Sequence, residues 1–320
     1  MTGNVSSGRV RRLGALDLGT NAFRMKAVET VPGGTMKPLR FDRVFTRLGE
    51  GIIHTGRIGE EPLRRALEAV RGFRGQLEQL GVDRYRAVGT SVFRRAANRD
   101  EVLERFRREA GVGIELIDGD TEAQLATAGV LLRLHHPPGW QVVFDVGGGS
   151  TEFILVRDGE IADHMSLDTG VVVLTETFLK SDPPTDAECR ALAARVAADL
   201  EPLSRFRQHL PDRTVPGICG TAGTVTSLAA LDLEQRSFDP DRINNHPISF
   251  GRAHELLEQL RHLPVHRRVE LPGLLKGRED LIIAGSYIVL EVMRRFGADR
   301  IVASDGGLLD GVLLKLAAGS

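Results

Sequence analysis

Residues 142–155, VVFDVGGGSTEFIL, contain the pattern that decides the fold. An apolar strand runs into Asp145, the chain turns through the three glycines 147–149, and a second apolar strand follows. A turn of this kind places one carboxylate beside backbone N–H groups that no neighbouring strand uses. The pattern therefore predicts a turn that can bind phosphate groups, although one copy alone favours an ordinary hairpin.

The same pattern occurs earlier in the chain, in ALDLGTN at residues 15–21. Asp17 stands where Asp145 stands in the later copy, and a strand again follows the turn. The small residues of this first turn are Gly19, Thr20 and Asn21. One copy in each half of the chain indicates two domains of related fold. Two such turns facing each other would hold an oligophosphate and its metal ion between the domains.

The composition is that of an ordinary globular protein. The chain has 320 residues, of which 42% are apolar and 27% charged, and this length fits about two domains. Its 42 basic and 43 acidic residues give a net charge of −1, so no global field attracts nucleic acid or an anionic membrane. The longest uncharged stretch, residues 214–231, is interrupted by proline and glycine, which excludes a membrane-spanning helix there.

Two further features favour a cytoplasmic location. Residues 1–19 contain no apolar core of signal-peptide length. The two cysteines, Cys189 and Cys219, do not form a CxxC motif, and the nine histidines include no HExxH motif. We therefore expect neither a disulfide framework nor a zinc site.

Strand and helix patterns alternate along the chain. Apolar segments bounded by turn residues predict strands at 13–28 (a hairpin), 39–44, 85–88, 113–117, 140–146, 151–157, 214–218 and 300–303. Helical spacing predicts helices at 62–80, 100–110, 121–134, 186–206, 250–262 and 278–296, one ending at 231 and one after 307. The alternation predicts an α/β fold. The break HHPPG at 135–139 predicts the division into residues 1–130 and 131–320, whose last helix can pack back on the first domain.

At these residues the chain resembles the superfamily of actin, the sugar kinases and the heat-shock chaperone ATPases. It is more closely similar to the exopolyphosphatase and guanosine pentaphosphate phosphohydrolase family. Beyond the two turns, the resemblance rests on AVGTSVFRRAANRD at 87–100, IDGDTEAQLA at 117–126, SLDTGVVVLTE at 166–176, GTAGTVTSLAAL at 220–231, GREDLIIAG at 277–285 and IVASDGGLLDGVLL at 301–314. It implies a duplicated ribonuclease H-like fold whose active site lies in an interdomain cleft.

The resemblance also implies roles for individual residues. Glu122 corresponds to the catalytic glutamate that accepts a proton from water, and Arg94 to an arginine that neutralises the transferred phosphoryl group. Asp145 corresponds to the metal-binding aspartate, with Glu152 as the second acidic residue, and the expected metal is Mg²⁺. The expected substrate-binding residues are Asp17, Gly19, Thr20, Asn21, Gly147, Gly148, Gly149, Ser150 and Thr151.

The chain departs from the family pattern in two places. The family usually has Glu-Ala-Arg in the first place, where this chain has Gln124 instead of the arginine. In the second place the family usually has Gly-Leu-Arg-Glu-Gly, where this chain has Leu309 instead of the arginine and Asp310 instead of the glutamate. The loss of two arginines can weaken anion binding or subunit contacts, but it removes no proposed catalytic group. The loop 220–224 resembles the adenosine-contacting loop of the superfamily, and a close approach of helix and strand explains its glycines equally well.

The expected function is Mg²⁺-dependent release of terminal phosphate from inorganic polyphosphate. Hydrolysis of guanosine pentaphosphate by the same groups is the close alternative. An actin-like ATP-binding module or kinase, or a weakly catalytic sensor of phosphate or alarmone, are alternatives of a different class. The resemblance implies a homodimer, and neither nucleic acid nor a membrane is expected as a partner.

Overall fold

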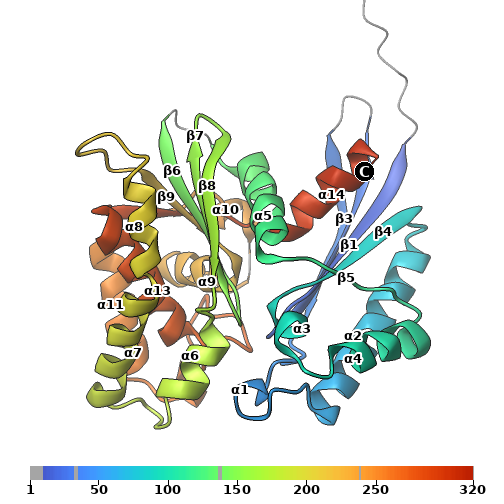
Figure 1. The fold of residues 1–320 in the computed structure, drawn as a ribbon, viewed down its shortest axis with the longest axis horizontal. Helices are drawn as coiled ribbons and strands as arrows, with labels where there is room; N and C mark the ends of the chain where they lie inside the picture. Colours follow the sequence, from blue (N-terminus) through green and yellow to red (C-terminus); the bar gives the residue numbers. More distant parts are fainter. Residues whose placement is uncertain (1–9, 32–34, 136–138, 238, 320) are drawn as a thin grey trace, which may run out of the picture. The chain divides into compact units, whose positions relative to one another are not determined.

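The computed structural model describes residues 10–31, 35–135, 139–237 and 239–319, which form two compact units (Figure 1). Unit 1 contains the chain up to residue 117 and again from residue 309, and unit 2 contains residues 118–308. Each unit holds one mixed β-sheet with helices packed on it. Most of the HHPPG break, residues 136–138, lies outside the described residues.

The sheet of unit 1 has the strand order β3-β2-β1-β4-β5. Its strands are β1 (Arg11–Leu18), β2 (Phe23–Thr30), β3 (Met36–Val44), β4 (Arg84–Gly89) and β5 (Glu115–Leu116). The first three run antiparallel as a meander, whereas β4 and β5 run parallel to β1. Its helices are α1 (Ile52–Thr55), α2 (Glu60–Gln79), α3 (Ser91–Arg95), α4 (Arg99–Arg105), a π-helical turn (Phe106–Ala110) and most of α14 (Leu308–Ala318).

The sheet of unit 2 has the order β10-β11-β9-β6-β7-β8. Its strands are β6 (Trp140–Val146), β7 (Thr151–Arg157), β8 (Glu160–Leu167), β9 (Gly217–Thr221), β10 (Pro247–Ser249) and β11 (Arg300–Ala303). Apart from the added edge strand β10, the order and strand directions repeat those of unit 1, with β6, β7, β8, β9 and β11 in the places of β1 to β5. The repeated topology confirms the predicted duplicated ribonuclease H-like α/β fold.

The helices of unit 2 are α5 (Gly119–Arg133), α6 (Val171–Phe178), α7 (Asp186–Asp199), α8 (Ser204–Arg207), α9 (Ala222–Asp232), α10 (Pro240–Ile243), α11 (Phe250–Arg261), α12 (Val265–Arg268) and α13 (Ile282–Phe296). Residues 118–130, which the sequence-based division assigns to the first domain, belong to α5 and the residue before it. This helix packs against β6, β7 and β8.

The sequence-based prediction missed the short elements α1, α3, α10, α12 and β10, and the strand predicted at 214–218 lies at 217–221 as β9. Three further differences have a local cause. The helix predicted over 186–206 ends at Asp199, because Pro202, in the 3₁₀ turn Glu201–Leu203, cannot donate a backbone hydrogen bond. The strand β8 was not predicted, since EIADHMSL alternates poorly between apolar and polar residues. The helix α6 was not predicted either, because its run of valines is typical of a strand.

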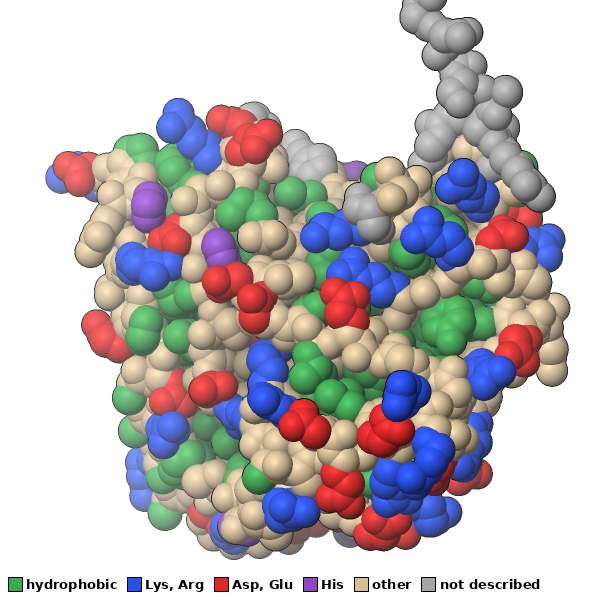
Figure 2. All heavy atoms as spheres, turned by 45° about the vertical axis from the view of Figure 1, so that its right-hand side comes forward, with side chains coloured by type: hydrophobic (Ala, Val, Ile, Leu, Met, Phe, Trp, Pro, Cys, Tyr) green, Lys and Arg blue, Asp and Glu red, His purple; other side chains and the backbone are tan. Residues whose placement is uncertain are grey.

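Each unit has its own apolar core. In unit 1 the ring of Phe106 packs against Phe23 and Phe93, and in unit 2 Phe144 stacks on Phe153 with ring centroids 5.9 Å apart. Acidic and basic side chains are interspersed over the face seen in Figure 2, as expected from the balanced net charge. Within the described residues, every helix is too short or too polar to cross a bilayer.

Candidate active site

The predicted residues of unit 1 lie at one edge of its sheet. Because β1 and β4 are parallel and Leu18 pairs with Gly89, their carboxyl ends are adjacent. The turn 18–21 follows β1, and Arg94 lies in α3 directly after β4. Arg94 Nη1 donates to Ile117 O at 2.9 Å, which ties this guanidinium to the same edge. The structure therefore places the first turn and Arg94 at the same edge of the sheet of unit 1.

The first turn is held by backbone hydrogen bonds from the segment after β3. Gly49 N–H donates to Thr20 O and Arg47 N–H donates to Asn21 O, both at 2.9 Å. Thr20 and Asn21 are buried, and within the described residues Asn21 Nδ2 has no hydrogen-bond acceptor. An unpaired buried donor costs about 1–3 kcal/mol, so a phosphate oxygen would be a favourable partner for this amide.

Asp17 forms an ion pair that sequence reasoning missed. It pairs across the sheet with Arg24 on β2, and its carboxylate accepts hydrogen bonds from Arg24 Nε at 2.7 Å and from Arg24 Nη2. Asp17 is buried and Arg24 partly so. The position of Asp17 therefore lets it orient the arginine, and its expected contact with substrate stays a prediction. The available signal was the repeat, since Arg24 follows Asp17 by the same seven residues that separate Glu152 from Asp145.

The second turn, at residues 147–151, is closed and then supported by α6. Gly147 N–H donates to Ser150 O at 2.9 Å. Val171 N–H donates to Gly147 O, and Val172 N–H donates to Gly148 O. The first two N–H groups of α6 thus donate hydrogen bonds to the first two carbonyl groups of the turn. The turn is fixed before any ligand arrives, as a phosphate-binding site requires.

Gly170, which precedes α6, is the residue that permits this approach. A Cβ atom there would lie 2.4 Å from Gly148 O and from the carbonyl carbons of Gly148 and Gly149. The backbone angles of Gly170, φ −116° and ψ 152°, are open to any residue, so the constraint is steric alone.

We expect Gly170→Ala to displace the second turn and to lower both activity and stability. Overpacking against backbone atoms costs about 1–3 kcal/mol in the free energy of unfolding. Gly251→Ala in α11 is the matched control, because a Cβ atom there meets nothing within 4 Å. Urea unfolding and phosphate release measured on both variants test this. Equal behaviour of the two variants would contradict the assigned role of Gly170.

Two carboxylates face each other across β6 and β7. Asp145 pairs directly with Glu152, at the register position where Asp17 pairs with Arg24 in unit 1. Glu152 is 1% exposed, and its Oε1 accepts hydrogen bonds from Ser150 Oγ at 2.7 Å and Ser166 Oγ at 2.9 Å. Asp145 is also buried. Like charges directly opposite are destabilising in a sheet, so this pair suits a cation.

The donor set fits Mg²⁺ rather than a transition metal. Among the described residues no group of three or more His, Cys, Asp and Glu side chains could hold a metal ion. Mg²⁺ is commonly held by one or two carboxylates together with substrate phosphates and water, whereas structural zinc needs four protein ligands. Asp145 and Glu152, next to a phosphate-binding turn, match the first pattern.

Glu122 lies in the first turn of α5, whose N-cap is Asp118. Asp118 Oδ1 accepts from Thr121 N–H at 2.7 Å, and its carbonyl accepts from Glu122 N–H. The backbone of this turn touches Ser166, since a Cβ atom on Gly119 would lie only 2.6 Å from the Cβ of that serine. Ser166 in turn donates a hydrogen bond to Glu152, so the turn is close to the carboxylate pair. The structure therefore brings the Glu122 turn to the Glu152 side of unit 2. The serine and this glycine were not predicted.

The segment 220–224, which the sequence predicted as a loop, consists of the end of β9 and the first residues of α9. An arginine that sequence reasoning did not assign packs against it. A Cβ atom on Gly223 would lie 1.8 Å from Arg278 Cζ, so the guanidinium packs directly against this glycine. Arg278 is buried. Crowding also explains Gly220, where a Cβ atom would lie 2.6 Å from a methyl group of Val225. The glycines of this loop thus serve close packing.

The two departures from the family pattern fall in different environments. Gln124 is exposed on α5. Leu309 is buried, and Asp310 beside it accepts a hydrogen bond from Lys26 Nζ at 2.6 Å. The change to leucine therefore adds an apolar contact, while the acidic residue that follows keeps a cationic partner on β2.

The chain matches the Ppx/GppA phosphatase family over residues 27–319. It is 32% identical to exopolyphosphatase 2 of Mycobacterium tuberculosis, over 96% of this chain and 98% of that protein. It is 27% identical to a guanosine-5′-triphosphate,3′-diphosphate pyrophosphatase of Aeromonas hydrophila, over 94% of this chain and 58% of that one. Its fold is similar to that of an exopolyphosphatase from Cytophaga hutchinsonii, with a TM-score of 0.88 and 26% identity over 97% and 98% of the two chains.

Proposed function

The chain belongs to the Ppx/GppA phosphatase family and is a phosphoanhydride hydrolase, and from this premise we propose that it is an exopolyphosphatase. It releases the terminal phosphate of inorganic polyphosphate by attack of water. The observation that carries the proposal is the carboxylate pair Asp145 and Glu152, set between the turn 147–151 and the first turn of α5.

In this mechanism Glu122 is the general base. The oxygen of a water molecule attacks the terminal phosphorus, the bond from that phosphorus to the bridging oxygen breaks, and Glu122 accepts the proton of the water. The products are orthophosphate and a polyphosphate shorter by one residue.

Asp145 and Glu152 are proposed to hold Mg²⁺, which supplies positive charge against the phosphate oxygens. Ser150 and Ser166 keep Glu152 oriented by their hydrogen bonds to its Oε1. The turn 147–151 then offers backbone N–H groups to the phosphates, because the hydroxyls of Ser150 and Thr151 donate to Glu152 Oε1 and to Thr169 O. In unit 1, the turn 18–21 and Arg94 are proposed to bind phosphate oxygens as well.

Arg278 is the observation that favours polyphosphate over guanosine pentaphosphate. Its guanidinium packs against Gly223, in the segment that resembles the adenosine-contacting loop of the superfamily. The loop 220–224 has no acidic side chain for the edge of a guanine base. A guanidinium binds phosphate oxygens in a bidentate manner, so Arg278 would suit a further phosphate of a long chain.

Phosphate release from four substrates tests the proposal: long polyphosphate, tripolyphosphate, guanosine pentaphosphate and ATP, each with Mg²⁺ present or chelated. We expect the highest kcat/KM for long polyphosphate, and KM per chain should fall with chain length and then level off as bound charges accumulate. Activity should disappear on chelation. A higher kcat/KM for guanosine pentaphosphate, at matched Mg²⁺ and salt, would replace the proposal by its close alternative.

The remaining alternatives have their own signatures in the same assay. Hydrolysis or transfer confined to ATP would indicate an actin-like nucleotide-binding module. Tight binding of polyphosphate or guanosine pentaphosphate without phosphate release would indicate a sensor.

A cytoplasmic location and a homodimer are also proposed. Cys189 and Cys219 are both buried free thiols, which suits a reducing compartment. Burial raises the pKa of the Cys219 thiol to about 12, so it carries no thiolate at neutral pH. The homodimer follows from the family resemblance, and light scattering on the purified protein tests it.

A further inference from the structure

The loop 304–307, between β11 and α14, rests on the strand ends that carry site residues. Thr221 Oγ1 donates to Gly306 O at 2.5 Å, and Thr221 is the residue of β9 paired with Asp145 on β6. A Cβ atom on Gly307 would lie 4.0 Å from Asp145 Oδ2. One side of this loop is therefore in contact with the sheet end that carries the carboxylate pair.

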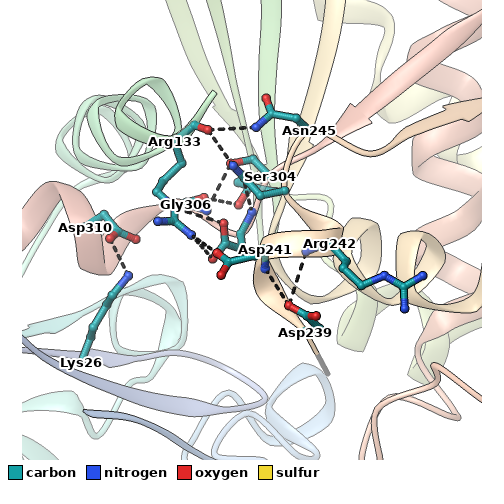
Figure 3. A network of polar contacts seen from close by, with 12 residues as sticks. Lys26, Arg133, Asp239, Asp241, Arg242, Asn245, Ser304, Gly306 and Asp310 are labelled. Atoms are coloured by element: carbon teal, nitrogen blue, oxygen red, sulfur yellow. Dashed lines mark hydrogen bonds and ion pairs between the residues drawn. The ribbon is translucent and has the colours of Figure 1, made fainter. Parts of the chain in front are cut away.

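The other side of the loop contacts the C-terminal part of α5. A Cβ atom on Gly306 would lie 2.4 Å from Gly129 O, so the loop backbone touches the helix backbone. Arg133 donates from Nε to Asp305 Oδ1 at 3.3 Å and from Nη2 to Asp305 Oδ2 at 3.2 Å. Figure 3 shows Arg133 extending from the end of α5 toward the loop at Gly306. The loop 304–307 is thus held between helix and sheet.

The last turn of α5 is anchored to the same region by two asparagines. Arg133 O accepts from Asn244 Nδ2 at 2.7 Å and from Asn245 Nδ2 at 3.1 Å (Figure 3). Asn245 N–H donates to the carbonyl of Ala303, the last residue of β11, at 2.8 Å. The end of the helix and the start of the loop therefore share one hydrogen-bonded network.

Glu122 and Arg133 belong to the same helix, one in its first turn and one in its last. Eleven residues correspond to about 16 Å, or about three turns, over which an α-helix is stiff. A rotation or slide of α5 at Arg133 is therefore transmitted to Glu122.

We propose that Arg133 and Asp305 are positioning residues for hydrolysis. Their ion pair fixes the loop 304–307 against α5 and so sets the position of the Glu122 carboxylate relative to Asp145. The proposal rests on the proposed function, in which these two carboxylates act as base and metal ligand. The side chains of the ion pair are 35% and 13% exposed, so the pair is partly buried and the thermal midpoint of each variant must be measured beside its kinetics.

The first test is kinetic and uses Arg133→Gln and Asp305→Asn. We expect kcat on polyphosphate to fall about three- to tenfold, with KM within about twofold and the protein still folded at the assay temperature. The double variant should be no slower than either single variant, and Arg133→Lys should recover part of the loss. The matched control is Arg261→Gln, which removes an ion pair with Asp186 elsewhere in unit 2 and should keep full activity.

The second test needs no substrate. Hydrogen exchange in Arg133→Gln should become faster both in residues 303–307 and in the first turn of α5, compared with the wild-type protein. Faster exchange in the loop alone, or kcat within twofold of wild type, would overturn the positioning role. A fall of kcat in step with the thermal midpoint, without recovery in Arg133→Lys, would overturn it too. If Glu122→Gln proves fully active, the assignment of Glu122 as the base in the proposed function fails, whereas the exchange data still decide whether this ion pair orders α5.

Discussion

Glu122→Gln is expected to lower the turnover of polyphosphate by about 10²- to 10⁴-fold, the usual effect of losing a general base. Glutamine keeps the size of the side chain and its place in the first turn of α5 but cannot accept a proton from water. KM should change little, because Glu122 contacts the attacking water rather than the bound phosphates in this mechanism. Initial rates of phosphate release over a range of polyphosphate concentrations measure both quantities.

Asp120→Asn is the matched control for this experiment. Asp120 lies in the same turn of α5, but its side chain is 71% exposed and its partner is His164 on β8, at 3.3 Å. Losing this carboxylate removes a similar charge from the helix N-terminus without touching the proposed base. The control should keep nearly full turnover. If both variants lose activity equally, the effect comes from the charge of the helix terminus and Glu122 is not the base.

The two phosphate-binding turns could be predicted from sequence because their signal is local. An apolar strand, an aspartate and a run of small residues specify a strand and a tight turn within a few positions of each other. The repeat then placed Asp17 and Asp145 at equivalent positions, and the equal topology of the two sheets confirms that duplication. Sequence reasoning therefore works best for short segments, whose own residues determine their conformation.

The supports of the site could not be predicted, because they depend on contacts between distant segments. Gly170 is needed only because α6 begins against the turn 147–151, and Gly119 is needed only because α5 begins against Ser166. Neither contact has a sequence pattern of its own. Equivalent positions in the repeat also differ in chemistry, since Arg24 in unit 1 corresponds to Glu152 in unit 2. This difference, rather than the shared pattern, indicates which turn suits a metal ion.

Asp145→Asn is expected to raise the Mg²⁺ concentration needed for half-maximal activity by about tenfold or more, since an amide keeps the shape of the side chain but lacks the negative charge. A second readout needs no turnover. In wild-type protein, Mg²⁺ should raise the thermal midpoint by binding the folded state, and Asp145→Asn should lose that increase.

The control is Asp17→Asn, the same substitution at the equivalent position of unit 1. There the carboxylate faces Arg24 and not a second acid, so the variant should lose an ion pair and some stability. Its Mg²⁺ requirement and its thermal response to Mg²⁺ should match those of wild type. If the Mg²⁺ requirement rises equally in both variants, or in Asp17→Asn alone, the carboxylate pair of unit 2 is not the metal site.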